Sequence, residues 1–182
     1  GPSMKKRKKE VYEKPTIVRN LLKSVNKYAG RSYVSGAFKE IDGIPVSSLL
    51  EKYGSPLYVV SEQTLRRKYQ EFIKAFRSLY PDTIVAYSYK TNYLMGICAI
   101  LKEEGTRAEV TSGFEYDLAR LLEVPGNQIV YNGPYKPSDQ LLRAVREGAF
   151  INIDSMTEIY QLEEITARLK SPLKVGIRVN MN

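Results

Sequence analysis

Short apolar runs alternate with longer amphipathic segments through most of this chain. The apolar runs begin near residues 83, 107, 128, 149 and 173, and their β-branched and aromatic side chains suit buried strands. Between them, apolar side chains recur every three or four positions, as on a helix with one buried face. The expected helices span residues 61–79, 94–104, 114–123, 138–147 and 155–169. Short strands that alternate with single helices predict an α/β fold with βα units on a parallel sheet.

Polar residues and glycines mark the ends of these helices. Ser61 precedes the first helix, and the last one opens with Ser155 and Glu158 at the spacing of a capping box. Gly105 and Gly148 follow the second and fourth helices, where a left-handed residue commonly ends a helix. The capping box accounts for Ser155, so we assign its side chain no chemistry.

The first 60 residues follow a different pattern. Apolar positions at helical spacing predict an amphipathic helix within residues 15–29, which could pack on the body or dock a partner. Residues 31–42 are polar and are expected to be irregular. A short helix capped by Ser47 should run through Tyr53, and residues 57–60 are expected to form a strand.

The positive charge of the chain is concentrated near its beginning. The run of lysines and arginine at residues 5–9 supplies five of the formal charges, and without it the net charge of +8 falls to +3. Basicity is therefore a property of the tail. We interpret the tail as a solvated terminus, and nucleic-acid binding, which would rest on the tail alone, is not expected.

The cysteine and histidine content of the chain limits the kinds of disulfide, catalytic nucleophile and metal site that it can form. The one cysteine, Cys98, excludes an intrachain disulfide and is expected in the core, among apolar residues at helical spacing. It also indicates a reducing, cytoplasmic location, and no run reaches the roughly 18 apolar residues of a membrane span. The absence of histidine excludes Ser-His and Cys-His nucleophiles and imidazole metal sites, so no metal site is expected.

A lysine stands at the end of the strand expected within residues 84–92. This residue, Lys90, is followed by polar residues, and α/β folds place their chemistry at the carboxyl ends of parallel strands. On position alone, a solvated lysine at the end of a strand is the favoured interpretation of Lys90, and a catalytic lysine is the alternative. Tyr87 and Tyr89 are expected to fill the interior and the packing layer of the fold.

Several segments resemble one known family. Residues 87–92, with the sequence Y-S-Y-K-T-N, resemble the Y-A-x-K-A-N segment of the pyridoxal-phosphate-dependent decarboxylases of the alanine-racemase-like barrel class, the diaminopimelate and ornithine decarboxylase family. Further similar segments follow in the family's order at residues 108–115, 129–136, 151–155 and 175–180, and residues 53–59 are similar to its opening segment. The resemblance covers roughly residue 44 to the C-terminus.

The resemblance implies a (β/α) barrel of the TIM type rather than an open doubly wound sheet. No G-x-G-x-x-G motif follows the first strand, which also weakens the dinucleotide-binding alternative. About five of the eight strands of such a barrel can be placed, so we expect an incomplete barrel, its N-terminal half, with an N-terminal helical extension. The predicted organisation is a basic tail and amphipathic helix at residues 1–30, a connecting segment at 31–60, and the N-terminal part of the cofactor-binding barrel at 61–182.

The resemblance also implies roles for residues at the predicted barrel mouth. Lys90 matches the family's Schiff-base lysine, which holds pyridoxal 5'-phosphate and is the expected catalytic residue. Glu109 lies where the family usually carries aspartate, and it would orient the cofactor or the lysine, or else form an ordinary ion pair. Arg178 would lie against the cofactor ring or its hydroxyl, since a guanidinium there would otherwise be a buried unpaired charge. Asn132 would line the site.

These matches imply decarboxylation of a small amino-acid substrate, with meso-diaminopimelate to L-lysine as the leading reaction. By the resemblance, the phosphate anchor and further site residues come later in the family's sequence, so this chain alone is expected to be inactive. The open sheet edges of an incomplete barrel would favour a homo-oligomer. The alternative is a non-catalytic barrel relative that serves as a binding or regulatory module.

Overall fold

The computed structural model describes residues 38–170 and 172–181 of the 182-residue chain. Residues Glu40–Asn182 form one compact unit, which carries all the elements below. The basic tail and the amphipathic helix predicted within residues 1–30 lie outside the described residues, as do residues 31–37 of the connecting segment.

Five parallel strands form the central sheet and lie side by side in sequence order. They are β3 (Ala86–Ser88), β4 (Arg107–Val110), β5 (Ile129–Tyr131), β6 (Phe150–Ile153) and β7 (Val175–Ile177). Each crossover moves the chain one place in the same direction, whereas a doubly wound sheet reverses direction at a switch point. The strand order is therefore the one that a β/α barrel uses, and the α/β prediction with five parallel strands is confirmed.

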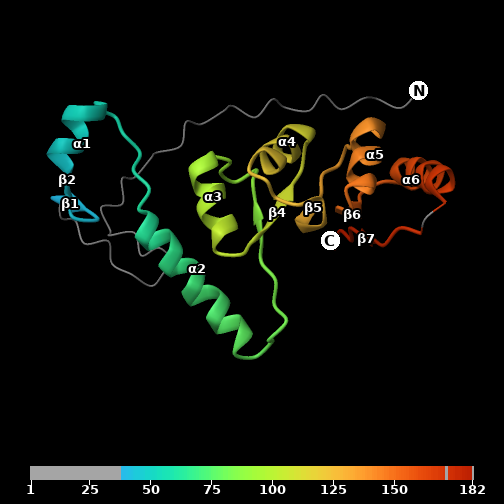
Figure 1. Cartoon of the computed structure of the whole chain (residues 1–182), viewed down its shortest axis with the longest axis horizontal. Coiled ribbons are helices and arrows are strands. Elements are labelled where there is room, and N and C mark those ends of the chain that lie inside the picture. The colour runs from blue at the N-terminus through green and yellow to red at the C-terminus, as the bar shows by residue number, and fades with distance from the viewer. Residues whose placement is uncertain (1–37, 171, 182) are drawn as a thin grey trace, which may run out of the picture. The chain divides into compact units, whose positions relative to one another are not determined.

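One helix precedes this sheet, and one helix follows each of its first four strands. They are α2 (Glu62–Arg77), α3 (Met95–Glu103), α4 (Gly113–Leu121), α5 (Ser138–Arg146) and α6 (Met156–Leu169). Figure 1 shows α3 to α6 in the same order as the strands that they follow. The five predicted helices are confirmed to within two residues at each end. Among the residues that the structure describes, none of the helices combines the length and apolar character that a membrane crossing requires.

Two helices begin at the serines that the sequence indicated. The Ser61 hydroxyl accepts the N–H of Thr64 at 3.0 Å, and the Ser155 hydroxyl accepts the N–H of Glu158 at 3.3 Å. In a capping box the glutamate would accept the N–H of the capping serine. Here the Glu158 carboxylate accepts the N–H of Asp154 at 3.0 Å instead, which turns the carboxylate towards the sheet.

A short hairpin lies before the first helix. β1 (Glu40–Ile41) pairs antiparallel with β2 (Ile44–Pro45) across Asp42 and Gly43, whose φ angles are 51° and 77°. Two successive residues with positive φ form a type I′ turn, for which Asp-Gly is a preferred sequence. The expectation of irregular structure is therefore wrong at residues 40–41, which form a strand.

The connecting segment continues as a helix and then as extended chain. α1 (Val46–Tyr53) confirms the short helix, but it begins after Pro45 without a side-chain cap, so the capping role expected of Ser47 is wrong. The strand predicted at residues 57–60 is also wrong. These residues pair with no strand of the described chain, and Tyr58 is fully exposed. A preference for extended backbone forms a strand only where a partner supplies the hydrogen bonds.

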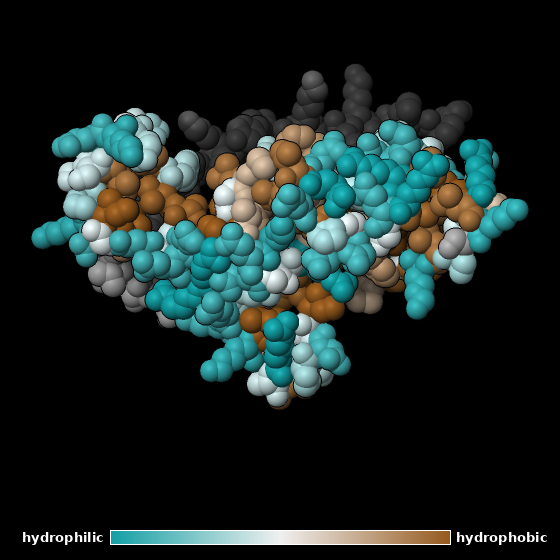
Figure 2. Space-filling view, viewed as in Figure 1, coloured by the Kyte–Doolittle hydropathy of each residue, from teal (hydrophilic) through white to brown (hydrophobic). Residues whose placement is uncertain are grey.

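The main core lies between the sheet and its helices. Val110, Tyr131 and Ile151 from three neighbouring strands pack with Tyr116 and Leu141 from α4 and α5, and all five are fully buried. On the face shown in Figure 2, polar residues in teal cover much of the surface, while apolar residues in brown show around α1 and in further patches along the molecule.

The core contains the cysteine and one of the two tyrosines that precede the candidate lysine. Cys98 and Tyr89 are each 2% exposed and belong to the main cluster, and Tyr87 is half-buried against it. The rings of Tyr87 and Tyr89 lie 6.1 Å apart. The core position predicted for Cys98 is confirmed, and the two tyrosines hold the end of β3 in place.

A polar network joins α4 to α5. Arg143 forms ion pairs with Asp117 and with Glu147. The Tyr116 hydroxyl donates a hydrogen bond to Glu147 at 2.7 Å, and Arg120 approaches the same carboxylate at 3.0 Å. Burial raises the pKa of Glu147, but hydrogen bonds from Tyr116 and Arg143 and the nearby positive charges outweigh it. The net pKa of Glu147 lies below its ordinary value of 4.5.

Candidate functional site

The four residues predicted for the site line one cavity at the carboxyl ends of the strands. Lys90 follows β3, Glu109 lies in β4, Asn132 follows β5 and Arg178 follows β7. The cavity has a volume of about 470 Å³. Its other lining residues are Thr111, Gly133, Pro134, Asn152, Asp154 and Ile177. The fold thus brings together residues that are far apart in the sequence.

Lys90 is exposed at the first turn after β3. The N–H of Tyr89 donates to the Glu109 carbonyl at 3.0 Å, so the pairing with β4 extends to the residue before the lysine. The N–H and the hydroxyl of Thr91 both donate to the Ser88 carbonyl, at 3.2 and 2.7 Å, which closes the turn. The lysine backbone is therefore fixed on both sides while its side chain stays exposed at the cavity.

Glu109 belongs to a chain of side-chain hydrogen bonds across three strands. The Asn132 amide donates to Glu109 Oε1 at 2.8 Å, and the Asn152 amide donates to Asn132 Oδ1. Glu109 forms no ion pair within residues 38–170 and 172–181, so the ordinary ion pair considered from the sequence does not occur there. Asn152 has no role in the sequence prediction. The signal was present, because alternation with buried Ile151 and Ile153 turns Asn152 to the other face of the sheet.

Arg178 lies at the opposite end of the cavity from Lys90 along the sheet. Its N–H donates to the Ile153 carbonyl at 2.9 Å, which extends the pairing of β6 and β7. Its guanidinium lies 3.6 Å from Asp154, and its side chain is 62% exposed. The expectation of a buried guanidinium is therefore wrong in this chain, although the side chain does have an acidic partner.

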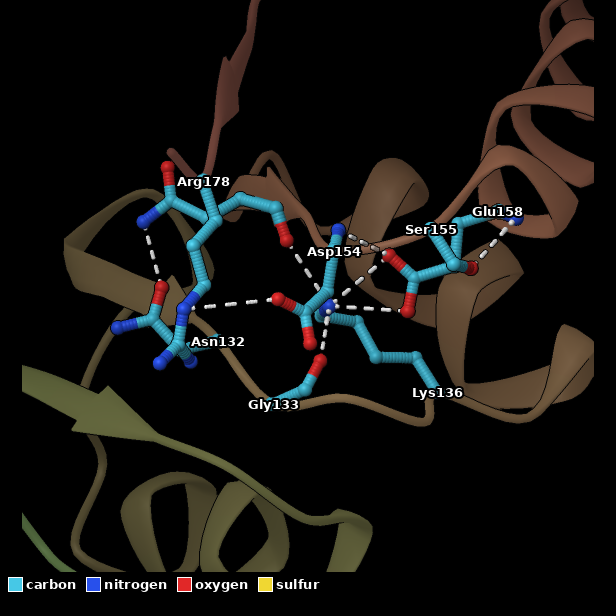
Figure 3. Close-up of polar contacts among 8 residues, drawn as sticks. Asn132, Gly133, Lys136, Asp154, Ser155, Glu158 and Arg178 are labelled. Atoms are coloured by element: carbon cyan, nitrogen blue, oxygen red, sulfur yellow. Dashed lines mark hydrogen bonds and ion pairs between the residues drawn. The ribbon is translucent and has the colours of Figure 1, made fainter. Parts of the chain in front are cut away.

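A buried lysine forms hydrogen bonds to the backbone of residues that line the cavity. Lys136 Nζ donates to the carbonyls of Gly133 and Asn152 at 2.8 and 2.9 Å and to both carboxylate oxygens of Glu158 at 3.1 Å. The side chains of Lys136 and Glu158 are 0% and 3% exposed. Figure 3 shows Lys136 among these groups, with Asp154 between them and Arg178. Lys136 has no role in the sequence prediction, although it ends segment 129–136, which resembles the family. The residues around it do not distinguish a buried lysine from an exposed one.

The backbone just after β5 passes close to the backbone just after β4. Gly133 has a φ of +110°, and a Cβ at this position would lie 2.5 Å from the Thr111 carbonyl oxygen. A side chain at residue 133 would therefore collide with the neighbouring backbone. The close approach brings Asn132 within reach of Glu109.

These residues fit a pyridoxal-type cofactor. An exposed lysine amine can bond covalently to an aldehyde, and carboxylate, amide and guanidinium groups around it can contact the polar atoms of a ring. The cavity volume of about 470 Å³ lies in the range of small-molecule sites. In barrels the phosphate group is commonly held after the seventh and eighth strands. The described residues would therefore hold the aldehyde and ring end of the cofactor.

Comparison with known proteins gives a consistent picture. Residues 62–182 match the family model described as the pyridoxal binding domain of pyridoxal-dependent decarboxylases. Diaminopimelate decarboxylase of Methanocaldococcus jannaschii is 36% identical over 148 residues, which cover 78% of this chain and 34% of that protein. The Aquifex aeolicus enzyme of the same name is 34% identical over 161 residues, which cover 88% and 37%.

Solved structures agree with these sequence matches. The crystal structure of diaminopimelate decarboxylase from M. jannaschii superposes with a TM-score of 0.72 at 35% identity, covering 79% of this chain and 34% of that one. A second structure of that enzyme, in complex with L-lysine, gives a TM-score of 0.70 at 35% identity, covering 76% and 33%. The chain spans about a third of the length of the curated relatives that it matches.

Proposed function

The chain belongs to the family of pyridoxal-dependent decarboxylases, as part of their pyridoxal binding domain, and on this premise we propose that it holds pyridoxal phosphate through Lys90. The observation that carries the proposal is the cavity in which Lys90, Glu109, Asn132 and Arg178 meet. When bound, the cofactor supplies an electron sink for the carbanion that remains as the substrate carboxylate leaves.

Each of the site residues has a separate role in this proposal. Lys90 would supply the amine that holds the cofactor through its aldehyde group. Glu109, held by Asn132, supplies a negative charge beside the cofactor. Arg178 supplies a positive charge across the cavity, and Asp154 orients its guanidinium. Hydrogen bonds of the residues on both sides of Lys90 fix the point at which its side chain leaves the backbone at the cavity.

The proposed reaction of the whole protein is decarboxylation of an amino acid, with meso-diaminopimelate to L-lysine as the leading candidate. The support is that the relatives at 30 to 36% identity carry the name diaminopimelate decarboxylase. This chain matches about a third of their length, so we propose that it has no turnover alone. Release of carbon dioxide from meso-diaminopimelate by the chain alone would contradict that proposal.

The direct test of cofactor binding is chemical. The chain is mixed with pyridoxal phosphate, reduced with borohydride to make the lysine–cofactor bond permanent, and mapped by peptide mass spectrometry. We expect modification to be concentrated at Lys90, to be lost with Lys90→Ala, and to be absent from Lys136, whose amine is buried. Modification spread evenly over the exposed lysines, or unchanged overall in Lys90→Ala, would refute the proposal.

A further inference from the structure

Three polar side chains meet in a row at the cavity because of the strand register. Tyr131 in β5 pairs with Ile151 in β6, so Asn132 and Asn152, the next residues, lie beside each other. Asn132 also reaches Glu109 on β4, on its other side. The row therefore runs from β6 through the end of β5 to β4, and it consists of one carboxylate and two amides.

The charge of Glu109 fixes the direction of every hydrogen bond in this row. An ionised carboxylate can only accept, so Asn132 must turn its NH₂ group towards Glu109. The Asn132 oxygen then faces Asn152 and can only accept, so Asn152 must turn its NH₂ group towards Asn132. Asn152 thus acts on Glu109 without contacting it.

Asn152 is itself held by its surroundings. Its backbone carbonyl accepts a hydrogen bond from the buried Lys136 amine at 2.9 Å. In the next strand it pairs with Gly176, where a Cβ would lie 1.9 Å from Asn152 Oδ1. Any side chain at residue 176 would push the amide out of place. The glycine provides the space that this orientation of Asn152 requires.

We propose that Asn152 is a positioning residue, which acts through Asn132 to fix the Glu109 carboxylate at the cavity, and that Gly176 is required for it. The positioning role rests on the proposed function, since it takes Glu109 to face the cofactor held by Lys90. Within the described residues, only one Glu109 oxygen is engaged by a hydrogen bond, that from Asn132. The other oxygen is left for the bound molecule.

The test uses the direction of the hydrogen bonds. Asn152→Asp puts a carboxylate at both ends of the row, and Asn132 can then offer its NH₂ group to only one of them. Adding Glu109→Gln provides a donor at position 109, so that Asn132 can turn over and satisfy both neighbours. The double variant should therefore recover what Asn152→Asp loses, although the two positions do not touch. Asn127→Asp, at an exposed residue before β5 and so at the opposite end of that strand from Asn132, is the matched control.

Two measurements are made on each variant of the chain. Urea unfolding reports stability, and titration with pyridoxal phosphate followed by borohydride mapping reports affinity at Lys90. We expect Asn152→Asp and Gly176→Ala to weaken affinity about tenfold, as in networks one contact removed from a ligand. We expect the double variant to bind no more weakly than Glu109→Gln, and Asn127→Asp to behave as the unmodified chain.

Each result decides a separate point. If the losses from Asn152→Asp and Glu109→Gln simply add in both measurements, the relay between them is refuted. If stability shows the recovery but affinity at Lys90 is the same in all variants, the positioning role is refuted and the row is structural only. If the unmodified chain is not labelled at Lys90, the proposed function fails, and the stability cycle still reports on the relay.

Discussion

Replacing Lys136 by methionine should be among the most destabilising single changes in the described part of the chain. The Lys136 amine donates to two backbone carbonyls and to the Glu158 carboxylate, and neither side chain is more than 3% exposed. Methionine is similar in length and carries no charge. The change therefore removes the donor while it opens little empty space.

The expected loss in the free energy of unfolding follows from the buried groups that the substitution leaves without a partner. Removing one partner of a buried ion pair costs about 3–5 kcal/mol, because the other charge stays buried without compensation. The carbonyls of Gly133 and Asn152 lose a donor at the same time. We expect the free energy of unfolding to fall by about 4 kcal/mol, a large part of the roughly 5–15 kcal/mol of a typical domain.

Urea unfolding at 25 °C measures this loss, with tyrosine fluorescence as the signal, since the chain has 14 tyrosines and no tryptophan. Lys74→Met, at an exposed position on α2, is the control and should change stability by less than about 0.5 kcal/mol. The double change Lys136→Met with Glu158→Leu removes the stranded charge and should regain about half of the loss. A loss below about 1 kcal/mol for Lys136→Met, or a double variant no more stable than the single one, would refute the reasoning.

Three further predictions concern stability. The pKa of Glu147 is below 4.5 in the folded chain, so its contribution to the free energy of unfolding is present above that pH and is lost as the pH falls. Glu147→Gln should therefore weaken the loss of stability at acidic pH, measured by urea unfolding at several pH values. An unchanged dependence of stability on pH would contradict this. Tyr131→Phe should leave stability unchanged or raise it by up to about 1 kcal/mol in urea unfolding, because the buried hydroxyl has no partner among the described residues; a clear loss would contradict it. Gly133→Ala should destabilise by more than about 1 kcal/mol, because φ is positive and the Thr111 carbonyl is too close. In contrast, Gly96→Ala, in α3 with open space around it, should stabilise by up to about 1 kcal/mol; equal effects at the two glycines would refute the steric argument.

Local periodicity was enough to predict the elements that are fixed by one buried face. The helix at Glu62–Arg77 and the strand at Arg107–Val110 each show their period in the sequence, and each is found where it was expected. The segment 57–60 has the same apolar content as a strand, but it has no partner in the described chain. The hairpin across Asp42 and Gly43 was missed because its strands are only two residues long, too short for any period.

The candidate site could be predicted only as far as its motif residues. Lys90 and Arg178 were found through a resemblance, and the fold places them at one cavity. The contacts that hold the cavity were not predictable, because they join side chains to groups on other strands. Lys136 and Asn152 act through backbone carbonyls and a neighbouring amide, and such contacts depend on register rather than on residue type.

The two edges of the sheet lead to a prediction about association. Within the described residues, β3 pairs only with β4 and β7 only with β6, so each has an open side. Ile177, the last residue of β7, and Val179, two residues further on, are 73% and 77% exposed. Open strand edges with exposed apolar residues favour pairing between copies.

We therefore expect the chain to self-associate as its concentration rises, measured by light scattering. Val179→Lys places a charge next to the β7 edge and should shift association to higher concentration, because a charge at an edge opposes pairing. Lys174→Glu, at an exposed position before β7, is the control for a change of charge away from this apolar pair. A chain that stays monomeric at high concentration would contradict the expectation. Val179→Lys raises the net charge and Lys174→Glu lowers it, so shifts of association in opposite directions would show that net charge, rather than the exposed edge, controls it.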